Sequence, residues 1–138
     1  MKNALVRTGF IALLGASLGG HAAELSEADL VRLGKLRFHN DCASCHGMSG
    51  KGDGPAATSL RKPPSDLTQI AKKNDGDYPA DYVARVVDGR GFEILAHGDV
   101  EMPVWGQQYR RSLAGLSEAR VKQRIDSLVA YLKTLQEP

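Results

Sequence analysis

Apolar residues recur at the spacing of one helical face in three stretches of the chain, and no stretch alternates as a strand does. The first helix is predicted from Ser26, a good N-cap residue, to about Asn40. The second begins near Pro79 and stops at Gly89, and the last begins near Ser117. The apolar faces of the second and last helices consist of Tyr82, Val83, Val86 and Val87, and of Val121, Ile125, Leu128, Val129, Leu132 and Leu135. This pattern predicts an all-α fold.

The segments between these helices have the composition of loops. Residues 48–64 contain several glycines and prolines, and residues 91–111 show no clear apolar period. Between them, a short helix is predicted over residues 66–73. The length of 138 residues suits a single domain behind a short leader.

Residues 1–22 have the organisation of a secretory signal peptide. Lys2 and Arg7 form a basic start, residues 9–20 carry no charge, and small residues follow. The uncharged stretch is shorter than the roughly 20 residues that a membrane span needs, and an uncleaved anchor is the alternative. We therefore expect residues 23–138 to form a domain that is exported to the bacterial periplasm, without stable membrane insertion once the leader is cleaved.

The charge balance adds little to this picture. The chain has 18 Lys and Arg against 16 Asp and Glu, for a net charge of +2. Removal of Lys2 and Arg7 with the leader would leave equal numbers of basic and acidic side chains. No basic excess remains that would favour a nucleic-acid partner.

The segment Cys42-Ala43-Ser44-Cys45-His46 contains both cysteines of the chain. Cys-x-x-Cys-His is the pattern of c-type haem attachment. Two thiols one helical turn apart can each bond one vinyl group of the same porphyrin, and His46 then lies under the iron as an axial ligand. The sequence therefore predicts one haem c, bound covalently through Cys42 and Cys45.

Two other uses of a Cys-x-x-Cys pair agree less well with the sequence. A dithiol redox pair usually occurs beside a βαβ pattern, which this chain lacks. A zinc site needs four ligands, and His39 and His97 show no zinc-type pairing. Haem attachment is the reading that the pattern favours.

The chain resembles the class I cytochrome c family across the whole segment after the leader. Gly34 and Phe38 precede Cys42 in a Gly-x-x-x-Phe-x-x-x-Cys arrangement that is similar to the family's first helix, and residues 128–132 are similar to its last. In that fold the N- and C-terminal helices cross beside the haem. The resemblance therefore implies that Gly34 lies at a close approach of two backbones.

The loop after the attachment motif is also similar to small bacterial members of the family. In Gly52-Asp53-Gly54-Pro55, the resemblance implies that the Pro55 carbonyl accepts a hydrogen bond from the axial histidine. Such a bond would fix the tautomer of His46 and raise its basicity.

A second axial ligand is suggested by Met102-Pro103-Val104-Trp105-Gly106, which resembles the Met-Pro-x-Trp-Gly segment of some small bacterial cytochromes c. There the methionine binds iron, and thioether ligation raises the reduction potential relative to two histidines. His97, in the same loop, is the rival ligand. Trp105 is expected to contact the haem, either through its ring nitrogen at a propionate or by packing on the porphyrin. Arg61 and Arg90 are further candidates for the propionates.

The expected function is electron transfer rather than catalysis. Iron held by His46 and Met102 would accept and release one electron, with transient redox partners as donor and acceptor. The alternatives are a haem subunit of a larger assembly, or a haem whose labile sixth site reacts with a gas or with peroxide.

Overall fold

The computed structural model describes residues 25–91, 102–112 and 116–138, and every regular element among them is helical. The predicted leader and His97 lie outside these residues. The longer helices are α1 (Glu27–Arg37), α3 (Ala80–Asp88), α4 (Trp105–Arg111) and α5 (Glu118–Thr134). The shorter ones are η1 (Phe38–Cys42), α2 (Ala43–His46), η2 (Ala57–Ser59), η3 (Leu67–Gln69) and η4 (Lys72–Asn74). The all-α prediction is confirmed.

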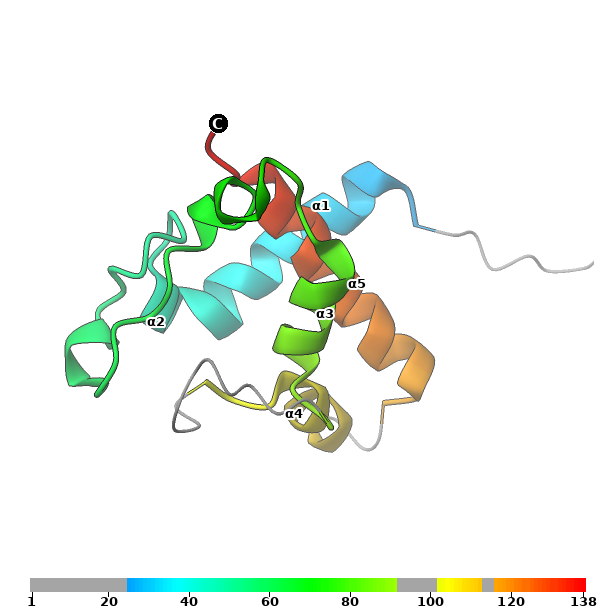
Figure 1. The fold of residues 1–138 in the computed structure, drawn as a ribbon. Helices are drawn as coiled ribbons and strands as arrows, with labels where there is room; N and C mark the ends of the chain where they lie inside the picture. The colour runs from blue at the N-terminus through cyan, green and yellow to red at the C-terminus, as the bar shows by residue number, and fades with distance from the viewer. Residues whose placement is uncertain (1–24, 92–101, 113–115) are drawn as a thin grey trace, which may run out of the picture.

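Helices α1 and α5 cross and form the centre of the molecule (Figure 1). Gly34 lies at the crossing, where a Cβ atom would collide with the carbonyl oxygen of Ser127 and come within 2.8 Å of the Cβ atom of Tyr131. Only glycine permits this approach without movement of a backbone. The predicted crossing of the N- and C-terminal helices at Gly34 is confirmed.

The helix ends agree with the capping residues in the sequence. The Ser26 hydroxyl accepts a hydrogen bond from the backbone N–H of Asp29 at 3.2 Å, and the Ser117 hydroxyl does the same for Arg120 at 3.4 Å. Helix α3 follows Pro79 and ends at Gly89, whose φ of 69° is the left-handed conformation that favours glycine at such a stop. The starts near 26, 79 and 117 are therefore confirmed.

Three predictions about the helical elements were wrong. The first α-helix does not run to Asn40, because the chain changes at Phe38 into the five-residue π-helix η1. The predicted helix over residues 66–73 is two separate 3-10 turns, η3 and η4. The predicted loop over residues 91–111 contains helix α4.

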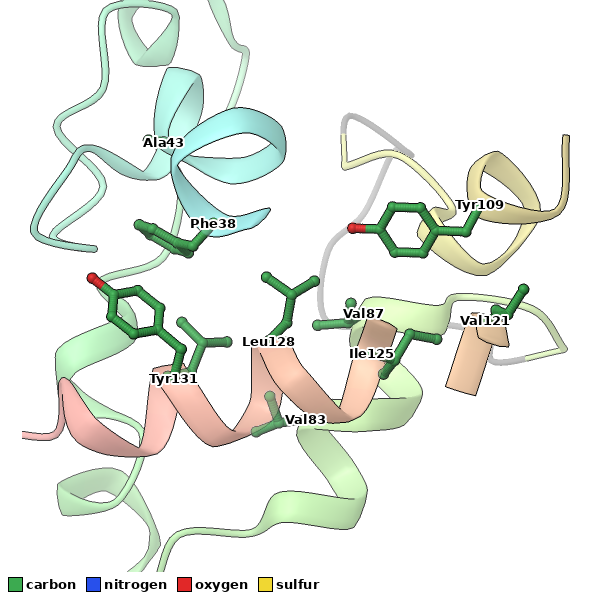
Figure 2. Close-up of a cluster of buried hydrophobic side chains, with 10 residues drawn as sticks. Phe38, Ala43, Val83, Val87, Tyr109, Val121, Ile125, Leu128 and Tyr131 are labelled. Atoms are coloured by element: carbon green, nitrogen blue, oxygen red, sulfur yellow. The ribbon is translucent and has the colours of Figure 1, made fainter. Parts of the chain in front are cut away.

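The buried core lies where η1, α2, α3, α4 and α5 meet. Figure 2 shows side chains that converge from these elements, namely Phe38, Ala43, Val83, Val87, Tyr109, Val121, Ile125, Leu128 and Tyr131, and Leu132 also belongs to the cluster. Helix α3 contributes Val83 and Val87 to this core. Tyr82, which was predicted on the same apolar face, is instead 43% exposed. In the part of the chain that the structure describes, no helix has the length and apolar character of a membrane span.

Candidate functional site

The Cys-x-x-Cys-His segment spans the junction of η1 and α2. Cys42 is the last residue of η1, and Cys45 and His46 lie on the single turn of α2 that follows. All three side chains are partly buried. Phe38 fixes the start of this segment, because its ring is fully buried and packs 5.4 Å from that of Tyr131 on α5.

The loop after His46 closes the short helix α2. Its backbone N–H groups at Gly52, Gly54 and Ala56 donate hydrogen bonds of 2.8, 3.1 and 2.8 Å to the carbonyl oxygens of His46, Cys45 and Ser44. These are carbonyls that the end of a helix would otherwise leave without a partner. A Cβ atom on Gly54 would lie 2.6 Å from the carbonyl oxygen of Ala43, so the loop needs a glycine here. The Gly-Asp-Gly-Pro loop thus holds the attachment helix in shape.

A backbone carbonyl orients the histidine ring. Nδ1 of His46 lies 3.1 Å from the carbonyl oxygen of Ser65, which follows the Pro63-Pro64 pair. A ligand histidine whose Nδ1 donates to a carbonyl presents Nε2 to the metal. The sequence alone does not predict the role of Ser65, because this residue is nineteen positions away from His46 in an irregular loop. The role expected of the Pro55 carbonyl stays a prediction.

The candidate sixth ligand borders the same core as the attachment segment. Met102 is partly buried and packs against the core cluster, as do Cys42 and Trp105. Trp105 begins α4, and its ring centroid lies 5.6 Å from that of Tyr109. Met48, in contrast, is 62% exposed.

A family model for cytochrome c matches residues 31–136 of the chain. The chain belongs to the cytochrome c family. The match includes the attachment segment, the Met102 loop, all of α5 and the larger part of α1. No curated protein and no solved structure is significantly similar to the chain. Members of the cytochrome c family carry a covalently bound haem c, and they generally transfer electrons rather than act as catalysts.

The residues of this cytochrome c fit such a haem. Cys42 and Cys45 are thiols spaced for two thioether bonds, and neither is used in a disulfide. The ring of His46 is already oriented through Nδ1, and Met102 supplies a soft sulfur donor beside the same apolar core. The chemistry of the donor set therefore agrees with one haem c.

The structure also bears on the other uses of the cysteine pair. Burial, with the nearby carboxylate of Asp41 and the Cys45 thiol, raises the pKa of the Cys42 thiol to about 12. Catalytic dithiols have the opposite property, a thiol pKa near or below neutrality. Within the described ranges, no three His, Cys, Asp or Glu side chains gather as metal ligands. Neither observation favours a redox dithiol or a zinc site.

Arg90, one of the two arginines considered for the propionates, is engaged elsewhere. It forms an ion pair with Asp88 at 2.6 Å and another with Glu118 at 3.0 Å. Glu118 also pairs with Arg110 of α4. Because Gly106 lies directly against Asp88 and Arg90, with no room for a Cβ atom, this ionic cluster packs on the start of α4. The structure therefore gives Arg90 a role in joining α3, α4 and α5.

Proposed function

We propose that this cytochrome c carries single electrons on one haem c, which Cys42 and Cys45 bind covalently and His46 and Met102 ligate. The observation that carries the proposal is that Cys42 and Met102 border one apolar cluster, although they are distant in the sequence. His46 follows Cys42 on the attachment segment, and its ring is oriented through Nδ1. A haem c in such surroundings supplies a one-electron Fe(III)/Fe(II) couple.

The protein's own residues would hold the haem and its ligands in position and shield them from water. Hydrogen bonds from the Gly52–Ala56 loop keep α2 in shape, and the Ser65 carbonyl keeps the ring of His46 in one orientation. A neutral thioether favours the reduced metal, so Met102 would set a higher potential than a second histidine. Fixed ligands and a dry core lower the reorganisation that accompanies each electron transfer.

We also propose that this cytochrome c is exported and that it contacts its redox partners only transiently. The leader-like residues 1–22 support export to the periplasm, with the domain starting near residue 23. We expect transient contacts with one redox protein as donor and another as acceptor, because rapid turnover requires weak interfaces, commonly below about 1,200 Å².

The ligand set is tested by the spectrum of purified ferric protein. A His–Met haem has a weak sulfur-to-iron charge-transfer band at the red end of the visible range, and Met102→Ala should abolish it. The same substitution should lower the reduction potential and allow carbon monoxide to bind the ferrous form. Met48→Ala is the matched control, since this exposed methionine should leave band and potential unchanged.

The rival readings give different outcomes. Loss of the native spectrum in His97→Ala, with no change in Met102→Ala, would replace the proposed pair by two histidines and lower the expected potential. Unmutated protein that lacks the band and binds carbon monoxide readily would point to a gas-binding or catalytic haem instead.

A further inference from the structure

A partly buried hydrogen bond joins the residue before the attachment segment to the helix that follows the candidate methionine ligand. The hydroxyl of Tyr109 on α4 donates to a carboxylate oxygen of Asp41 on η1 at 2.8 Å. These residues are 68 positions apart in the chain. Asp41 directly precedes Cys42, and Tyr109 belongs to a helix that begins three positions after Met102. The bond therefore links the two sides of the proposed haem site.

The surroundings of Tyr109 hold its hydroxyl in place. The residue is 3% exposed and points from α4 into the core (Figure 2). Its ring packs beside Trp105 with centroids 5.6 Å apart, and the Arg124 guanidinium lies 5.3 Å from the ring centroid. Burial, and next the hydrogen bond to Asp41, raise the pKa of Tyr109 above its ordinary value of 10.0. The hydroxyl thus keeps its proton, and remains a donor, throughout the neutral range.

Helix α4 also contacts parts of the molecule other than η1. Arg110 pairs with Glu118 at the start of α5, and Gly106 packs on the Asp88–Arg90 pair at the end of α3. Among the described residues, the position of α4 relative to η1 then depends on the packing of the core and on the Tyr109–Asp41 bond. A seven-residue helix has little stability of its own, so its position depends on such tertiary contacts.

We propose that the Tyr109–Asp41 hydrogen bond is a positioning contact that keeps Met102 at the iron. The inference rests on the proposed function, since it assumes His46–Met102 ligation. Met102 reaches α4 through Pro103 and Val104, so a helix fixed against η1 fixes the starting point of the ligand. Loss of the hydroxyl would leave the partly buried Asp41 carboxylate without this donor, and α4 would move away from η1 more often. Each such movement would release the methionine.

The test compares two tyrosine hydroxyls in the haem-loaded protein. Tyr109→Phe removes the hydroxyl and retains the ring that packs on Trp105 and Arg124. Tyr78→Phe is the matched control, because the half-buried Tyr78 hydroxyl donates to the carbonyl of Val129 on α5 at 3.2 Å rather than to the attachment segment. The measurement is the rate at which cyanide displaces the sixth ligand of the ferric protein. We expect an increase of about tenfold in Tyr109→Phe, as a loss of ~1.4 kcal/mol in loop closure would give, and no change in Tyr78→Phe.

The outcomes separate this inference from the proposed function. A wild-type protein without the sulfur-to-iron band would refute His–Met ligation itself. A wild-type protein that has the band, with equal cyanide rates in Tyr109→Phe and Tyr78→Phe, would refute only the positioning role. If Tyr109→Phe does not fold, Asp41→Ala provides the same readout, because it removes the acceptor of the same hydrogen bond. It should raise the rate by a similar factor, and an unchanged rate would overturn the proposal.

Discussion

Gly34 is the residue at which the two crossing helices come closest. Added atoms at this position meet the Ser127 carbonyl and the Tyr131 side chain, and neither can move without disturbing α5. Ser127 is itself fully buried, and its hydroxyl accepts a hydrogen bond from Nε of Arg37 at 3.0 Å. The position therefore tolerates no side chain, although an alanine elsewhere in a helix would stabilise it relative to glycine.

We predict that Gly34→Ala lowers the free energy of unfolding by about 2 kcal/mol, the usual cost of overpacking a core. Urea unfolding followed by far-ultraviolet circular dichroism measures the change. Leu36→Ala on the same helix is the control: its side chain is 55% exposed, and its effect should stay within about 0.5 kcal/mol. Equal stability of Gly34→Ala and the wild type would contradict the packing argument.

At the scale of elements, the sequence predicted those helices that have both a cap and an apolar period. Ser26, Ser117 and Gly89 marked three ends correctly. Helix α4 could not be predicted in this way, because it is only seven residues long and buries only Gly106 and Tyr109. The π-helix η1 also has no local signal, since tertiary packing of Phe38 and the following turn decides its register.

The candidate site, like the helices, could be predicted from the sequence only in part. The motif itself predicted Cys42, Cys45 and His46 as a group, and the resemblance added Met102. The partners that orient them, Ser65 and Tyr109, are joined to the site by contacts across 19 and 68 positions. No spacing rule in the sequence reports such contacts, because the fold alone brings these residues together.

The ionic cluster at the ends of α3, α4 and α5 gives a prediction with a pH dependence. The Arg90 guanidinium binds both carboxylate oxygens of Asp88, at 2.6 and 2.9 Å, and lowers the pKa of Asp88 below its ordinary value of 3.8. A carboxylate with a lowered pKa stabilises the fold above that ordinary value, and this contribution disappears as the pH falls through the folded-state pKa. The pair is partly exposed, which limits it to about 1 kcal/mol.

We therefore expect Asp88→Asn to be less stable than the wild type by about 1 kcal/mol at pH 7, as measured by urea unfolding. The difference should persist down to about pH 5 and close below about pH 4, as the wild type loses the charge of Asp88. Asp77→Asn removes an exposed carboxylate outside the cluster and should match the wild type at pH 7. A difference that stays constant down to pH 3 would show that the Asp88 charge is not its cause.

At the scale of the whole molecule, the haem would act as a covalent part of the core. Low aromatic content leaves a large share of the interior to be filled, and Cys42 lies at the edge of the apolar cluster. Two thioether bonds would join this group to the chain irrespective of folding. The covalent attachment should therefore survive conditions that release a haem bound only through its axial ligands.

Acidic organic extraction of denatured protein tests this expectation. The polypeptide should retain the mass of one haem, and Cys42→Ser combined with Cys45→Ser should lose it entirely. A single substitution should leave the group attached through the remaining cysteine. Complete extraction of haem from the unmutated chain would refute covalent attachment.

The crossing of α1 with α5 also determines when the chain can fold. Arg37 and Ser127, which bond across the crossing, are 90 positions apart. Closing a loop of this length costs roughly 4 kcal/mol of chain entropy, and α1, with eleven residues, is too short to persist alone in water. In a growing chain, helix α1 therefore lacks its main partner until α5 has been made. Folding becomes a late event that follows the synthesis of α5, and a chain that stops before α5 should remain a substrate for proteases.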